Sequence, residues 1–240
     1  MTEGEWLACR WPRVMLEYLT GTPGLIYKIR VQQHPRGRRK LRLFGVAVAR
    51  RVIHLVSNPD LHQLLDAAEA FADGFGTVEA LEKLRIKGGV HSFMGVDDNA
   101  GEERYRYLLT RTTRQELAAQ AVGTLDARDA YSAAYMHNNA ALALEGENIE
   151  VETARQCQFV RDIFGNPFRP VAFDAAWRTS TATALARQMY ESRDFGAMPI
   201  LADALQDAGC TSDDVLSHCR DPLATHVRGC WVVDLVLGKS

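Results

Sequence analysis

The last third of the chain is divided by closely spaced helix-start and helix-stop residues, and this pattern limits the fold more than any other feature. Segments of roughly 8 to 15 residues, with apolar positions three or four apart, lie between these signals. Gly165, Gly209 and Gly238 are the stops, and Thr179 or Ser180 begins one of the helices. The pattern is typical of short helices, so we expect an all-α fold.

Two further signals refine the boundaries in this part of the chain. Pro167 and Pro170 restrict the residues before them, which predicts an extended segment over "PFRPVAF". Asp174 is suited to capping a short turn, and Thr211 with Asp214 three residues later predicts a capping box for "DDVLSHCR". A final apolar segment, "CWVVDLV", completes the set of helices.

The first two thirds of the chain also favour helices. Pro12 fits a helix start. The stretch "TGTPGLIYKIRVQQHPRGRR" indicates a loop or short hairpin. The apolar spacing from Leu41 indicates a helix, although "LRLFGVAV" alone would also suit a strand. Further helices are predicted over residues 58–73, 77–87, 113–122 and 126–145. We therefore predict an irregular bundle of about nine helices in a single domain over residues 1–240, with a basic insertion near residues 20–37 and another near 88–112.

Composition limits the class of protein. The N-terminus has no basic region followed by an apolar run, and no stretch approaches eighteen apolar residues. These features predict a cytoplasmic protein that is not embedded in a membrane. The five cysteines are an odd number, which favours buried thiols over a disulfide framework.

Positive charge is concentrated in one segment. No acid lies between Glu17 and Asp60, whereas nine lysines and arginines do. Clustered guanidinium and ammonium groups bind phosphates without a particular motif, so this segment is a candidate site for nucleic acid or another anionic surface. The sequence pI of about 6.4 disfavours this hypothesis, and the same arginines suit the outer face of a core helix. The candidate anion-binding residues are Arg36, Arg38, Arg39, Lys40 and Arg42.

Cysteines and histidines gather near the C-terminus, in "CTSDDVLSHCRDPLATHVRGC". Their spacing is looser than that of known zinc motifs. His226 and Cys230 can face one ion if the chain between them is helical, whereas adjacent His218 and Cys219 leave a helix about 100° apart. The alternative is that the cysteines are small buried apolar residues. The candidate ligands for a small zinc site are Cys210, His218, His226 and Cys230.

The sequence does not favour an enzyme. It contains no nucleophile elbow, no H-E-x-x-H and no phosphate-binding loop. A catalytic set of a cysteine nucleophile, a histidine and a carboxylate can be proposed, but a chain with seven histidines permits many such combinations. A pocket that places a histidine, a cysteine and a carboxylate within hydrogen-bond reach would contradict a non-enzymatic function. The residues available for a catalytic cysteine–histidine–carboxylate set are Cys219, Cys230, His218, His226, Asp221 and Asp234.

The remaining hypothesis is an interaction module. The aromatic residues of "DIFGNPFRPV" either attach an extended segment to the helices or form a site for another protein, with Phe164, Phe168 and Arg169 as candidate contacts. From Tyr190 onward the chain contains eight acidic and four basic residues, so charge is unevenly distributed along the sequence. The leading prediction is a non-enzymatic, all-α protein that presents a basic N-terminal loop and an acidic C-terminal face to a protein partner.

Several long phrases of the chain resemble an uncharacterised family of paralogous bacterial proteins of the planctomycete type. They are "TEGEWLACRWPRVMLEYL", "RKLRLFGVAVARRVIHLV", and "RDIFGNPFRPVAFDAAWRTSTATALARQMYESRDFGAMPILADALQDAGC" followed by "HVRGCWVVDLVLGK". Together they cover 100 of the 240 residues, whereas "LIYKIRVQQHPRG" resembles an insertion. The resemblance implies a helical, bacterial, cytoplasmic protein. The family has no assigned activity, so the resemblance identifies no site residue.

Overall fold

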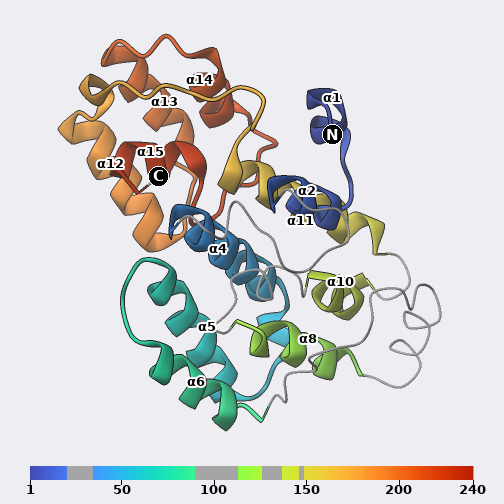
Figure 1. The fold of residues 1–240 in the computed structure, drawn as a ribbon. Coiled ribbons are helices and arrows are strands. Elements are labelled where there is room, and N and C mark those ends of the chain that lie inside the picture. The colour runs from blue at the N-terminus through green and yellow to red at the C-terminus, as the bar shows by residue number, and fades with distance from the viewer. Residues whose placement is uncertain (21–34, 90–112, 126–136, 146–148, 240) are drawn as a thin grey trace. The chain divides into compact units, whose positions relative to one another are not determined.

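The all-α prediction is confirmed. The computed structural model describes residues 1–20, 35–89, 113–125, 137–145 and 149–239. Within these ranges the chain forms twelve α-helices and two short 3-10 helices, and no strand (Figure 1). The number exceeds the nine predicted, in part because the opening segment forms two helices, α1 (Glu3–Ala8) and α2 (Pro12–Thr20), with proline at the start of the second.

The chain divides into two compact units. The first contains Met1–Ala8 and Gln158–Ser240, and the second contains Cys9–Cys157. Helix α11 (Glu150–Phe164) crosses this boundary, so its first half belongs to one unit and its second half to the other. A single domain over residues 1–240 stays a prediction, and both predicted insertions lie largely outside the described residues. No described helix combines the length and the apolar character needed to cross a membrane.

Helix α4 organises the unit formed by Cys9–Cys157. It contacts α5, α8 and α10, and its side chains Leu41, Phe44 and Val48 are buried, as their helical spacing predicts. The other described helices of this unit are α2, α5 (Pro59–Ala72), α6 (Val78–Lys87), α8 (Arg114–Gly123) and α10 (His137–Glu145), with a 3-10 turn η1 (Ile53–Leu55).

The position of α4 corrects one prediction. This helix extends over Pro35–Val52, so the basic residues predicted in a loop lie instead on its first turns. Proline is suited to the first turn of a helix because its missing N–H would have no intrahelical acceptor there. Residues 21–34, where the rest of the loop or hairpin was predicted, lie outside the described residues.

Three of the helices predicted in the second unit begin with side-chain caps. The side chain of Asn58 accepts a hydrogen bond from the Asp60 N–H at the start of α5, and Thr77 accepts one from Ala80 at the start of α6. Thr113 begins α8 with a reciprocal capping box. Each cap provides an acceptor for an N–H that has no partner within the helix.

Buried carboxylates in this unit are paired with arginines. Arg39 contacts Asp73 at 3.0 Å, Arg50 contacts Glu69 at 2.8 Å, and Arg51 contacts Glu152 at 3.0 Å. The side chains of these three acids are at most 2 % exposed. A buried negative charge is tolerated when a hydrogen-bonded cation compensates it.

In the other unit, helices α12 to α15 pack against one another (Figure 1). They share one apolar core. Its elements are α1, the second half of α11, the 3-10 turn η3 (Ala175–Trp177), α12 (Ser180–Ser192), α13 (Met198–Asp207), α14 (Asp213–Arg220) and α15 (Trp231–Leu237). Gly165 ends α11 at a φ of +73°, a conformation that favours glycine.

The caps of this unit agree with the predictions except at one helix. Asp174 and Thr179 cap η3 and α12 as predicted. The cap of α14 is Ser212, whose hydroxyl accepts from the Val215 N–H, and not Thr211. Ser212 takes this role because it directly precedes the first helical residue and so lies within reach of the third helical N–H.

Candidate metal centre

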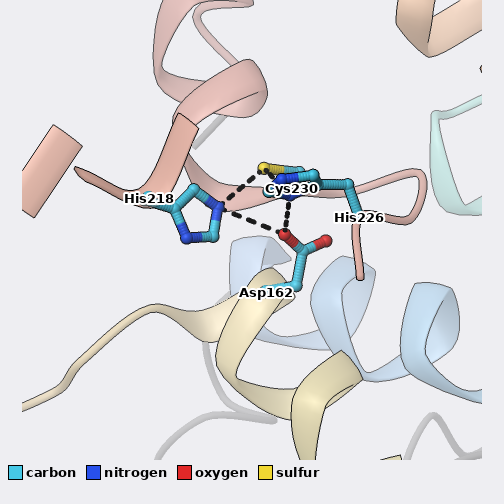
Figure 2. A group of neighbouring side chains, drawn as sticks. All are labelled: Asp162, His218, His226 and Cys230. Atoms are coloured by element: carbon cyan, nitrogen blue, oxygen red, sulfur yellow. Dashed lines mark hydrogen bonds and ion pairs between the residues drawn. The ribbon is translucent and has the colours of Figure 1, made fainter. Parts of the chain in front are cut away.

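Four side chains from four elements meet in the C-terminal unit. Asp162 lies in the last turn of α11, and His218 lies in the last turn of α14. His226 comes from the segment between α14 and α15, and Cys230 is the residue immediately before α15. One potential metal-binding atom from each residue lies within 4.8 Å of the other three (Figure 2).

The donor atoms of these residues point toward one another. His226 Nδ1 lies 2.8 Å from Asp162 Oδ1, and His218 Nε2 lies 3.2 Å from the same oxygen. His218 Nε2 also lies 3.2 Å from Cys230 Sγ, and His226 Nδ1 lies 3.9 Å from that sulfur. Figure 2 shows all four side chains directed toward a common point.

These separations are close to those of a tetrahedral zinc site. Zinc–nitrogen and zinc–oxygen bonds near 2.0–2.2 Å, and a zinc–sulfur bond near 2.3 Å, place neighbouring ligand atoms about 3.3 to 3.6 Å apart. The measured distances of 2.8 to 3.9 Å lie on both sides of this range. All four donor atoms lie within 4.8 Å of one another, so the widest pair would have to close by about 1.2 Å at most to reach the spacing that zinc requires.

The backbone orients the aspartate. The N–H of Val227 donates to Asp162 Oδ2 at 2.8 Å, which leaves Oδ1 facing the two imidazoles. A hydrogen bond to the distal oxygen of a ligating carboxylate is a common feature of protein metal sites, because it fixes the orientation of the ligand.

The surroundings of the centre are apolar and aromatic. The His218 ring lies 5.2 Å from the Trp231 ring, and the His226 ring lies 6.2 Å from the Phe195 ring, measured between centroids. Asp162 is 3 % exposed and Cys230 is fully buried. Low water access strengthens electrostatic interactions within the centre.

The acid and the thiol of this centre have opposite pKa shifts. Burial raises the pKa of the Asp162 carboxyl, but hydrogen bonds from His218 and His226 outweigh burial, so the net shift is downward. Burial, together with the charge of Asp162, raises the pKa of the Cys230 thiol well above its ordinary value. Without a metal, the centre therefore combines an ionised carboxylate with a protonated thiol.

The arrangement differs from that of a cysteine nucleophile. In a catalytic triad the histidine contacts the nucleophile through one ring nitrogen and the carboxylate through the other. Here the same nitrogen, His218 Nε2, lies 3.2 Å from both Cys230 Sγ and Asp162 Oδ1. A reactive cysteine also needs a lowered pKa and solvent access, whereas Cys230 is buried and its pKa is raised. These three groups meet the distance condition that would contradict a non-enzymatic function. Distance alone is not sufficient, because the three groups converge on one point and do not form the relay that a cysteine nucleophile requires.

The structure brings together three of the four ligands that the sequence suggested. His218, His226 and Cys230 belong to the centre, whereas Cys210 is buried in the apolar core and is not among the four converging residues. Cys219 is buried there as well, and burial raises its pKa to about 12, as expected of a structural thiol.

Sequence reasoning missed Asp162. The residue lies 56 positions before His218, and no local spacing connects the two. One signal was available, since Asp162 lies between Val160 and Ile163, both of which are buried on α11. An acid on the apolar side of an amphipathic helix is rare without a partner or a metal.

The candidate anion-binding residues lie on α4. Arg36 and Arg38 are exposed there, and Lys40 is partly buried. Arg39 is in the ion pair with Asp73, and the guanidinium of Arg42 lies 4.9 Å from the centroid of the Phe71 ring. Arg39 and Arg42 are thus engaged within their own unit, and binding of nucleic acid through this segment stays a prediction.

The candidate partner-binding residues lie at the end of α11 and just after it. Phe164 and Phe168 are partly buried, whereas Arg169 is exposed. Arg169 forms an ion pair with Glu3 at 2.5 Å. The chain's own N-terminal helix thus contacts Arg169.

Comparisons with known proteins assign no family to the chain. No family model, no curated protein and no solved structure matches it. Function must therefore be inferred from the side chains of the centre.

Proposed function

We propose that this protein is a zinc-binding helical module in which Asp162, His218, His226 and Cys230 hold one ion with a structural role. The observation that carries the proposal is the convergence of four donor atoms on one point. Hydrogen-bonded networks generally extend from group to group, whereas metal ligands share a single centre.

The types of donor favour zinc. One thiol, two imidazoles and one carboxylate provide sulfur, nitrogen and oxygen, the three ligand atoms that zinc accepts in proteins. Calcium and magnesium prefer oxygen alone, so the thiol and the imidazoles disfavour them. A divalent ion would also balance the carboxylate and the thiolate, which leaves no net charge in a buried site.

The number and burial of the ligands favour a structural role. Catalytic zinc sites usually have three protein ligands and keep the fourth position for water or substrate. Here four protein donors are available, one for each position of a tetrahedral site, and they connect α11, α14, the 221–229 segment and the start of α15. A structural metal is consistent with a non-enzymatic module that binds another protein, which we retain as part of the proposal.

Metal analysis of the purified protein tests the proposal. We expect one zinc per chain, and we expect Cys230→Ser to weaken zinc binding by at least about 100-fold, because a ligand is lost. Cys210→Ser is the matched control, since it changes a buried cysteine of the same unit that is not in the centre. A fully folded protein that binds no zinc, or equal zinc loss in both variants, would contradict the proposal.

A further inference from the structure

Helix α1 belongs to the same unit as the candidate metal centre, although about 150 residues of chain separate the two. Its start is fixed by reciprocal bonds, in which the Thr2 N–H donates to Glu5 and the Glu5 N–H donates to the Thr2 hydroxyl. Six residues are too few for a stable isolated helix in water. Helix α1 is therefore formed because it is docked, and the side chain of Trp6 is fully buried.

Three polar side chains hold α1 in place. Arg161 donates two hydrogen bonds to the carbonyl oxygen of Trp6, at 2.9 and 3.2 Å. This carbonyl is one of the last four of α1, and no N–H within the helix can donate to these four. A cation near that end of a helix is also favourable, because the end carries partial negative charge. At the other end, Glu3 accepts from Asn166 at 2.7 Å and pairs with Arg169 at 2.5 Å.

On both α11 and α14, residues that hold α1 lie close in sequence to residues of the candidate metal centre. Arg161 and Asp162 are neighbours on α11, so one contacts α1 and the next belongs to the candidate metal centre. On α14, Asp214 lies 3.8 Å from the guanidinium of Arg169, and His218 follows one helical turn later. Both helices that supply ligands to the centre therefore also supply groups to the α1 docking site.

From this arrangement we infer that zinc binding and the docking of α1 are coupled, so that the ion strengthens docking and its removal releases the N-terminal helix. The inference rests on the proposed zinc centre. An ion shared by Asp162 and His218 fixes the end of α14 against α11, and this holds Arg169 and Asp214 in position for Glu3. Because coupling between two binding events is reciprocal, docked α1 must raise the affinity for zinc by the same factor.

Hydrogen exchange of α1 in the full-length protein tests the inference. The amides of Trp6, Leu7 and Ala8 report docking directly, because an isolated helix of this length would not protect them. We expect zinc to slow their exchange by about tenfold relative to chelator-treated protein, which is within the usual range of coupling between sites. Exchange in α5, which belongs to the other unit, should not change.

Arg161→Gln separates coupling from ligand loss. This variant keeps all four ligands but loses the bonds to Trp6, so α1 should exchange rapidly with or without zinc. It should still bind one zinc, with an affinity lower by the factor measured for docking. Unchanged exchange in α13 would show that the variant is folded.

The two proposals fail in distinguishable ways. If elemental analysis finds one zinc per chain and α1 exchange is the same with and without it, the coupling is wrong and the zinc centre stands. If the folded protein binds no zinc at all, both are wrong. If Arg161→Gln leaves α1 protected, the docking contacts assigned here are wrong.

Discussion

Helix α11 carries two buried acids whose surroundings differ. Glu152 is paired with the guanidiniums of Arg51 and Arg155, at 3.0 and 3.6 Å. Asp162, ten residues later and in the other unit, contacts the two imidazoles of His218 and His226. Both carboxylates are almost entirely buried, so the difference lies in their partners.

The comparison shows how the partner decides what a buried carboxylate can do. Arginine stays protonated at all accessible pH values and does not bind metals, so Glu152 can serve only in a fixed ion pair. Imidazole gives up its proton readily and binds zinc through either nitrogen. The imidazoles beside Asp162 can therefore exchange their protons for a metal ion. Cys230 supplies a further potential ligand at the same site.

Metal removal should produce the largest difference between the two units. When the free zinc concentration is 1,000 times the dissociation constant, zinc binding adds about 4 kcal/mol to the free energy of unfolding. Stripping the metal should therefore speed amide exchange in α14 and in the 221–229 segment by up to about 1,000-fold, while α4 and α5 keep their rates. Hydrogen exchange with mass spectrometry, before and after chelation, provides the measurement. Equal acceleration in both units would argue against a local metal centre.

Neutralising each acid in turn should separate the two roles. Asp162→Asn should weaken zinc binding by at least about 100-fold, because it removes a ligand. Glu152→Gln should leave zinc binding unchanged and lower the free energy of unfolding by about 2 kcal/mol, because charge-assisted bonds to Arg51 are lost. Zinc titration against a competing chelator and denaturant unfolding measure the two effects. A loss of zinc in Glu152→Gln would remove the distinction between the two acids.

The pH dependence of zinc affinity should be smaller but measurable. Burial and the charge of Asp162 raise the pKa of the Cys230 thiol, so zinc must displace its proton at any pH below that value. The pKa of Asp162 is lowered, so this group is already ionised and releases no proton. Affinity should therefore increase about tenfold per pH unit between pH 7.5 and 8.5. An affinity that is constant over this range would exclude the thiol as a ligand.

Much of the helical fold follows from local signals. The caps at Asn58, Thr77, Thr113 and Thr179 were predictable because an N-cap needs only a side-chain acceptor at the right position. The cap of α14 was assigned one residue too early, since Thr211 and Ser212 carry the same hydroxyl chemistry. Local chemistry identifies a helix start but does not always choose between adjacent candidates.

The candidate metal centre was only partly predictable, because it depends on tertiary contacts. His226 and Cys230 are four residues apart, and their pairing could be proposed from spacing. Asp162 joins them only through the packing of α11. Cys210 was a candidate ligand because local spacing does not distinguish a ligand from a small buried apolar residue, which is what Cys210 is. A site built from distant segments leaves little signal in any one of them.

Zinc K-edge X-ray absorption of the purified protein tests the central claim most directly, because it reports the atoms bound to the ion. The four-residue centre predicts one sulfur at about 2.3 Å and three nitrogen or oxygen atoms at about 2.0 to 2.2 Å. The sulfur contribution should disappear in Cys230→Ser and persist in Cys210→Ser. Two sulfurs, no sulfur, or six oxygen ligands in the unmodified protein would contradict the proposed centre.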